Sequence, residues 1–241
     1  MAGRLVTPTW LRDNLRSVKV LDCSWHLPFV NRNAKAEFAE AHIPGARFFD
    51  IDEVKDFSRA DLPHMLPPPE LFGSCMDSFG IANDDHVVVY DTAGVGPACR
   101  VFWTFHAMGH ERVSVLDGGL PAWTAQRSEV EAGEAPGAVP TSKKYAARPI
   151  DALVADYTGI VKAIGELKAS GGARGVQIVD ARPHARFTGE APEFRPGLSS
   201  GHMPHAISVP FTAVTEAADP AAPQAQTLKS PAGIRKVFEG A

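Results

Sequence analysis

The stretch Val87-Val88-Val89-Tyr90-Asp91 decides the fold of this chain. Four consecutive apolar residues that favour β structure, closed by a carboxylate, predict a strand buried on both faces, as the strands of parallel sheets are. Working outward from it, we expect strands at 18–21, 46–49 and 113–116 and helices at 34–41, 70–79 and 100–108. Strands that alternate with helices are typical of α/β proteins, in which helices flank a parallel sheet.

The composition is that of a globular protein with no preference for polyanions. Of the 241 residues 44% are apolar, which suffices for a core, and the formal net charge is −4. The charge is divided unevenly, since residues 1–140 carry −7 and residues 141–241 carry +3. We therefore expect no nucleic acid and no membrane as a partner, and we expect a small anion to prefer the second half.

Three cysteines, at positions 23, 75 and 99, are too few and too scattered for a disulfide framework or a metal site. The sequence shows neither a signal peptide nor an apolar run of about 18 residues. The stretch Gly94-Val95-Gly96-Pro97 lacks the Lys-Ser/Thr ending of a phosphate-binding loop. These features predict an intracellular protein, in the cytoplasm or the mitochondrion, that uses no cofactor and no metal.

The second half repeats landmarks of the first. Val179-Asp180-Ala181 matches Leu21-Asp22-Cys23, and residues 201–206 (Gly-His-Met-Pro-His-Ala) match residues 41–46 (Ala-His-Ile-Pro-Gly-Ala), at offsets of 158 and 160 residues. This spacing predicts two duplicated domains. Their expected bounds are 1–128 and 150–241, with a linker at 129–149 that is rich in Gly, Ala, Pro and charge.

The second domain is expected to contain fewer strands than the first. Strands are predicted at 152–155, 177–179 and 206–209, followed by a helix that opens at Ser230-Pro231. The counterpart of the strand at 87–90 would begin at about position 247. We therefore expect the second domain to be incomplete at its C-terminal side.

Several motifs agree with one known family. They are the pattern Leu-Asp-Gly-Gly-x3-Trp at 116–123, Asp-Cys-Ser-Trp at 22–25, Phe-Phe-Asp-Ile-Asp at 48–52, His-Met-Leu-Pro at 64–67 and the repeated His-x-Pro turn. With them the chain resembles, along essentially its whole length, the tandem rhodanese-type sulfurtransferases that use thiosulfate or 3-mercaptopyruvate. The resemblance implies two rhodanese-like domains with parallel sheets flanked by helices, the second of them incomplete.

The family's chemistry defines what the chain would need. A cysteine thiolate takes sulfur from a small anionic donor as a persulfide and passes it to cyanide or to a thiol acceptor, such as thioredoxin or a small thiol. The first domain carries Asp91 at the nucleophile's position, and the repeat spacing places the nucleophile of the second domain near position 251. We therefore expect these 241 residues to lack the nucleophile and to transfer sulfur poorly. The alternative is a non-catalytic binding or regulatory module.

The resemblance implies that Arg186 and Arg195 bind the donor's carboxylate or sulfonate, a role that suits guanidinium groups because they bind anions through two hydrogen bonds. Arg182, which lies in the same loop, is expected to be structural. The alternative for the cluster is a solvated basic loop that pairs locally with Glu190 and Glu193.

Asp52 and His64 are the supporting catalytic candidates, since the resemblance assigns them to proton movement. A hydrogen-bonded structural histidine is the alternative for His64. Cys99, at the start of a predicted helix, is the one candidate for a substitute nucleophile. We expect it instead to be a small packed side chain.

Overall fold

A computed structural model describes residues 3–59, 61–134, 144–171, 176–195, 197–219 and 222–241. The contacts divide the chain into two compact units. The first comprises residues 1–153 and 217–227, and the second comprises residues 154–216 and 228–241. Helices and parallel strands build both units, which confirms the α/β fold class.

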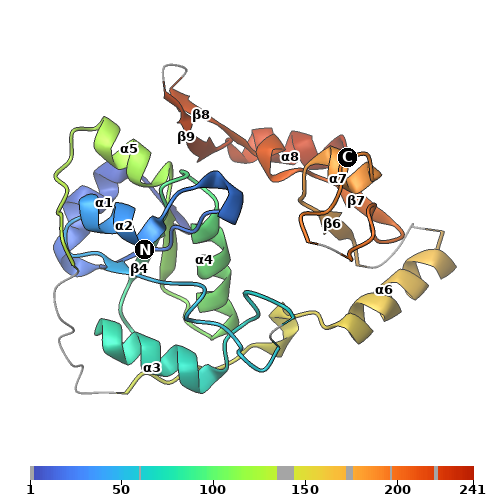
Figure 1. The fold of residues 1–241 in the computed structure, drawn as a ribbon, viewed down its shortest axis with the longest axis horizontal. Helices are drawn as coiled ribbons and strands as arrows, with labels where there is room; N and C mark the ends of the chain where they lie inside the picture. The colour runs from blue at the N-terminus through green and yellow to red at the C-terminus, as the bar shows by residue number, and fades with distance from the viewer. Residues whose placement is uncertain (1–2, 60, 135–143, 172–175, 196, 220–221) are drawn as a thin grey trace. The chain divides into compact units, whose positions relative to one another are not determined.

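A five-stranded parallel sheet forms the centre of the first unit (Figure 1), in the order β1-β5-β4-β2-β3. The strands are β1 (Leu5–Val6), β2 (Lys19–Asp22), β3 (Arg47–Phe48), β4 (Val87–Tyr90) and β5 (Val113–Leu116). All four residues of the central strand β4 are buried, which confirms the burial predicted from its sequence. Val87 and Val89 face one apolar core, and Val88 and Tyr90 face the other.

Helices cover both faces of this sheet. They are α1 (Pro8–Asn14), α2 (Ala34–Glu40), α3 (Pro69–Phe79), α4 (Pro97–Ala107) and α5 (Gly119–Ala125). The helices α3 and α4 bury Phe72 and Phe105 in the core that contains Val87. On the other face α1, α2 and α5 contribute Leu11, Phe38 and Trp123. A turn of 3₁₀ helix, η1 (Leu15–Ser17), connects α1 to β2.

The segment predicted as a linker lies against the first unit at its C-terminal end. Tyr145 is only 7% exposed and belongs to the core beneath α3 and α4. Its hydroxyl lies 2.9 Å from Nδ1 of His110. The backbone N–H groups of Arg148 and Ile150 donate to carbonyl groups at the end of α4 and just beyond it. Residues 135–143 of this prediction fall outside the described residues.

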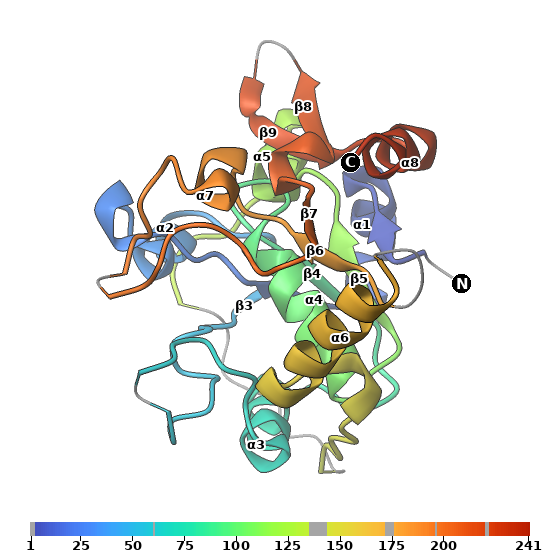
Figure 2. The ribbon, with the colours of Figure 1, turned by 90° about the vertical axis from the view of Figure 1, so that its right-hand side faces the viewer.

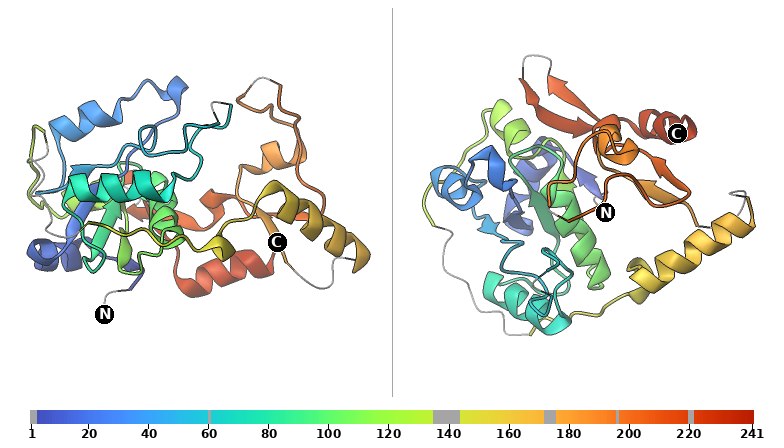
Figure 3. Two further views of the ribbon diagram at one scale, coloured as in Figure 1. Left: turned by 90° about the horizontal axis from the view of Figure 1, so that it is seen from below. Right: turned by 45° about the vertical axis from the view of Figure 1, so that its right-hand side comes forward.

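The second unit is built on a parallel pair, β6 (Ile178–Asp180) and β7 (Ala206–Ser208), which Figure 2 labels. Its helices are α6 (Tyr157–Ala169), α7 (His184–Thr188) and α8 (Pro231–Glu239). The hairpin of β8 (Thr215–Asp219) and β9 (Ala222–Leu228), which the sequence did not predict, belongs mostly to the first unit and is followed in the chain by α8 (Figure 3). No helix in the described part of the chain is long and apolar enough to cross a membrane.

The prediction of a strand at 152–155 is wrong. Residues Asp151–Leu153 form a turn of 3₁₀ helix, η3, closed by the N–H of Leu153 donating to the carbonyl of Ile150 at 2.9 Å. The side chains of Ile150, Leu153 and Val154 are 42 to 45% exposed. Among the described residues this apolar stretch pairs with no strand, and the hydrogen bond within its own turn forms instead.

Candidate functional site

The two units hold an aspartate in the same way where their first matched strand ends. In the first unit Oδ1 of Asp22 accepts a hydrogen bond of 2.9 Å from the backbone N–H of Ser24. In the second unit Oδ1 of Asp180 accepts one of 3.0 Å from the backbone N–H of Arg182. The carboxyl ends of parallel strands are where α/β proteins place their sites, so these loops are where chemistry is expected.

The repeated turn also makes the same contact in both units. The ring of His42 stacks on Phe38 at 4.0 Å, and the ring of His202 stacks on Phe187 at 3.8 Å. Nδ1 of each histidine lies 2.8 Å from the backbone carbonyl oxygen of the phenylalanine on which it stacks. Both histidines are therefore held by a phenylalanine of the preceding helix, α2 or α7, which indicates a structural role for this motif.

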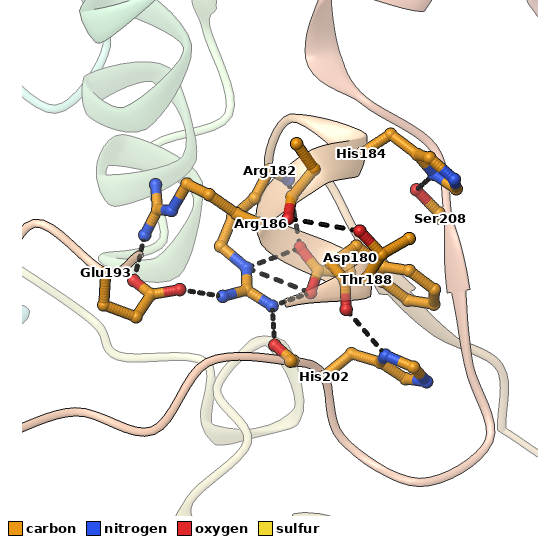
Figure 4. A network of polar contacts seen from close by, with 11 residues as sticks. Asp180, Arg182, His184, Arg186, Thr188, Glu193, His202 and Ser208 are labelled. Atoms are coloured by element: carbon orange, nitrogen blue, oxygen red, sulfur yellow. Dashed lines mark hydrogen bonds and ion pairs between the residues drawn. The ribbon is translucent and has the colours of Figure 1, made fainter. Parts of the chain in front are cut away.

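In the second unit Arg182 ties the strand end to the following loop (Figure 4). Its guanidinium donates to both carboxylate oxygens of Asp180, at 2.5 to 3.0 Å, and to Oε1 of Glu193 at 2.6 Å. The carbonyl of Gly201 accepts a further hydrogen bond of 2.7 Å. The hydrogen bonds from Arg182 lower the pKa of the Asp180 carboxyl. These contacts occupy the guanidinium and agree with the structural role expected for Arg182.

Arg186, on α7, meets the other oxygen of Glu193 through one terminal nitrogen (Figure 4). Its guanidinium also lies 4.5 Å from the ring centre of Phe194, at cation–π distance. Within the described residues its Nε is buried and has no hydrogen-bond partner. A buried donor without a partner is rare in folded proteins and marks this guanidinium as a candidate for binding an acceptor.

The third arginine of the cluster makes no hydrogen bond or ion pair with this network in the described part of the chain, and one acidic residue of the loop joins the other two arginines. Arg195 is exposed. Glu193 pairs with Arg182 and Arg186, as the alternative interpretation of the loop predicted for this residue. The sequence therefore identified the arginines but not that one glutamate links two of them, since Glu193 lies 11 and 7 residues away without regular spacing.

In the first unit the structure brings together Asp52 and His64. Nε2 of His64 lies 2.9 Å from Oδ1 of Asp52, while the indole N–H of Trp25 donates to Oδ2 of Asp52 at 2.9 Å. Desolvation alone would raise the pKa of the Asp52 carboxyl, but the hydrogen bonds from Trp25 and His64 outweigh it and hold that pKa below its usual value. Asp52 is therefore an ionised partner that orients the imidazole.

Two neighbours that sequence reasoning did not assign position this pair. The ring of Trp25 meets that of His64 edge to face at 4.8 Å. Arg100, on α4, donates to the backbone carbonyl of His64 at 2.6 Å. A cavity of about 210 Å³ opens beside Trp25 and Asp52. The only signal for Trp25 was its place within the Asp-Cys-Ser-Trp motif.

The side chain of Asp91 is held within the loop between β4 and α4 in the first unit. Its carboxylate is buried and accepts hydrogen bonds of 2.8 to 3.0 Å from the backbone N–H groups of Ala93, Gly96 and Ala98. Three N–H groups that point at one centre form a cradle for an anion. Here the side chain of Asp91 itself is that anion.

None of the three cysteines has the surroundings of a reactive thiolate. Burial raises the pKa of the Cys75 thiol to about 12 and that of Cys23 well above its usual value. The prediction that Cys99 is a packed side chain is wrong, because the residue is exposed on the first turn of α4. Partial burial of the thiol, and then the charges of Asp91 and Asp117, nevertheless raise its pKa to about 11.

Comparisons with known proteins identify the family of the chain. A family model for the rhodanese-like domain matches residues 7–126. The chain is 44% identical over 207 residues to the probable 3-mercaptopyruvate sulfurtransferase of Schizosaccharomyces pombe, covering 86% of this chain and 67% of that protein. It is 36% identical over 243 residues to the 3-mercaptopyruvate sulfurtransferase of Homo sapiens, covering 98% of this chain and 76% of that protein.

Solved structures share the fold. The crystal structure of SseA from Escherichia coli matches with a TM-score of 0.81 at 32% identity, over 99% of this chain and 84% of that one. The sulfur transferase subunit of yeast mitochondrial complex I matches with a TM-score of 0.85 at 32% identity, over 99% and 81%. The chain therefore belongs to the family of rhodanese-type sulfurtransferases, as its motifs predicted. It spans 58% of a mitochondrial thiosulfate/3-mercaptopyruvate sulfurtransferase of Arabidopsis thaliana.

Proposed function

We propose that this chain serves sulfur transfer from a small anionic donor, 3-mercaptopyruvate or thiosulfate, to a thiol acceptor. With 3-mercaptopyruvate, a cysteine thiolate attacks the donor sulfur, the carbon–sulfur bond breaks, and the enolate that leaves takes up a proton to become pyruvate. The cysteine then holds the sulfur as a persulfide until a thiol takes it. The described residues are suited to binding the donor and moving the proton.

The observation that carries the proposal is the side chain of Arg186. Glu193 and Phe194 fix its guanidinium, and its buried Nε has no partner within the described residues. A donor carboxylate or sulfonate supplies the acceptor oxygens that this nitrogen needs. Arg195, exposed in the same loop, adds a second positive charge for the donor.

The pair of Asp52 and His64 is proposed to carry the proton. The ionised carboxylate accepts from one ring nitrogen of His64, so the other ring nitrogen is the site proposed for proton transfer. This is the arrangement in which a carboxylate sets the orientation and tautomer of a catalytic imidazole.

The sulfur-carrying cysteine is proposed to be none of Cys23, Cys75 and Cys99. Even Cys99, with a pKa of about 11, would be a thiolate in only about one molecule in ten thousand at pH 7. This observation also favours the second candidate, a rhodanese-type module that binds a donor without turning it over. Both candidates require the anion site at Arg186.

Calorimetric titration with pyruvate, the carboxylate that remains of 3-mercaptopyruvate, tests that site. Arg186→Ala should weaken binding at least about tenfold, because a charge-assisted hydrogen bond is worth about 1.5–3 kcal/mol. The matched control is Arg235→Ala, which removes an exposed arginine from α8 in the same unit. Equal weakening in the two variants would show a general effect of charge and would contradict the proposal.

A further inference from the structure

Two adjoining hollows lie at the end of the first unit's sheet where the strands begin. One, of about 210 Å³, is lined by Lys19 at the start of β2, Arg47 at the start of β3 and the apolar side chains of Val18, Phe79 and Ile81. Asp22 and Asp91 lie at the opposite, carboxyl ends of the strands, as the last residue of β2 and the residue after β4. The hollows are therefore separate from the loops that carry the candidate sulfur chemistry.

The second hollow, of about 690 Å³, continues the first, since both are lined by Leu15 and Pro44. The end of α1, the turn η1 and the segment after α5 form its walls. From these elements come Arg12, Arg16 and Arg127. Two short connections and one helix end thus bring three arginines to one depression.

Positively charged residues are concentrated at these hollows, although residues 1–140 as a whole carry a negative net charge. Residues 1–140 hold 12 Lys and Arg and carry a net charge of −7, yet five of those 12 line the two hollows. The lining holds only two acidic residues, Asp13 and Glu129. Arg12 pairs with Asp13 at 3.4 Å, whereas Arg16, Lys19 and Arg127 have no ion pair among the described residues. Concentrated unpaired charge of one sign attracts an anion.

A buried polar atom in the larger hollow points to a ligand independently of charge. Oγ of Ser128 is buried and lacks a hydrogen-bond partner in the part of the chain that the structure describes. The indole N–H of Trp123 donates to the carbonyl of Glu129 at 2.7 Å, which fixes the segment that carries this hydroxyl. Buried hydroxyl groups are normally hydrogen-bonded, so Ser128 is suited to meet an acceptor oxygen.

We propose that these two hollows form a binding site for a phosphate-bearing small molecule of nucleotide size. The guanidinium groups of Arg12, Arg16 and Arg127 bind the phosphate oxygens, which match their planar fork of donors. Ser128 donates to one of those oxygens. The smaller hollow receives the uncharged ring against Val18 and Phe79, with Lys19 at its rim.

Calorimetric titration of the 241-residue protein with inorganic tripolyphosphate tests the site. We expect saturable binding of one molecule per chain, weakened about tenfold or more in the variant Arg12→Gln/Arg16→Gln/Arg127→Gln, since three charge contacts are lost. The control Arg4→Gln/Lys144→Gln/Arg148→Gln removes the same charge from exposed positions outside the hollows, and its affinity should stay within about twofold.

Two further measurements separate the parts of the proposal. Ser128→Ala, which leaves the charge unchanged, should weaken tripolyphosphate binding about threefold. ATP should displace tripolyphosphate, because both occupy the arginine hollow. Absence of saturable binding, or equal weakening in the control variant, would overturn the site, and ATP that fails to compete would overturn the assignment to a nucleotide-sized ligand.

Discussion

Asp22 in the first unit and Asp180 in the second occupy matched places with opposite electrostatic surroundings. Burial raises the pKa of Asp22 to about 6, more than the hydrogen bonds from Ser24 lower it, whereas the guanidinium of Arg182 holds the pKa of Asp180 below its usual value. Deeper burial of the first carboxyl and the guanidinium two positions after the second make the difference. One backbone arrangement can therefore hold either a carboxyl that protonates readily or a permanent carboxylate.

The two strands that end at these aspartates also differ in how deeply their apolar side chains are buried. Leu21 is completely buried between two layers of helices, whereas Val179, its match in β6, is 40% exposed. The first unit relies on apolar burial along its strand, and the second relies on ion pairs at the strand's end. Substitutions at matched positions can measure this difference.

The largest effect is expected in the apolar pair. Leu21→Ala should destabilise the first unit by about 2–5 kcal/mol, because it leaves a cavity in a closed core. Val179→Ala should cost the second unit less than about 1 kcal/mol, since much of its side chain already meets solvent. Hydrogen exchange of the amides of β4 and β6 reports each unit separately. Equal losses of protection would show that the two strands are buried alike.

A smaller effect is expected at the arginine. Arg182→Ser gives the second unit the residue that the first has at Ser24, and it leaves the nearly buried carboxylates of Asp180 and Glu193 without this partner. We expect a loss of about 2 kcal/mol in the second unit, less than for a deeply buried pair because Arg182 is partly exposed. The control is Arg235→Ser, and the measurement is hydrogen exchange of the β6 and β7 amides. No loss of protection would mean that solvent replaces the guanidinium.

The smallest effect is the pH dependence of the first unit. Because the folded-state pKa of Asp22 is raised to about 6, its stabilising contribution is complete below the unfolded pKa of about 4 and is lost as the pH rises through 6. Between pH 5 and pH 7.5 this group should remove about 1.4 kcal/mol from the free energy of unfolding. Asp180 acts with the opposite sign, since its lowered pKa means that stability is lost as the pH falls.

Urea unfolding of Asp22→Asn and of the unsubstituted chain at these two pH values isolates that contribution. The asparagine has no proton to lose, so the variant should become relatively more stable by about 1.4 kcal/mol at pH 7.5 than at pH 5. A stability difference that stays constant with pH would place the pKa of Asp22 near its unperturbed value.

The sequence predicted elements that carry a strong signal within their own residues and missed those recognisable only through distant partners. The apolar run of β4 and the Ser230 cap of α8, where Ser230 Oγ accepts from Gly233 at 3.1 Å, were both predictable. The two-residue strand β1 was not, because it exists only through its pairing with β5. The β8–β9 hairpin is rich in Ala, Gln and Pro and shows no alternation of apolar and polar residues.

In the candidate site, too, single residues were predictable and contacts between distant residues were not. Motifs identified Asp52, His64 and Arg186, because a motif records residue type and order. They could not show that Glu193 connects Arg182 to Arg186, or that Trp25 completes the hydrogen bonding of Asp52. Those contacts depend on how loops fold over the strand ends, which has no regular period in the sequence.

The burial of Tyr145 has a practical consequence for anyone who divides the protein into fragments. A polypeptide cut at residue 128, where composition suggested the domain would finish, would leave Phe72 and His110 without the ring that packs against them. Such a fragment would expose an aromatic-lined hole and would tend to aggregate on expression. We therefore expect a stable fragment of the first unit to need the segment up to Leu153, in which Tyr145 joins the core, and residues 217–227, which the contacts group with it.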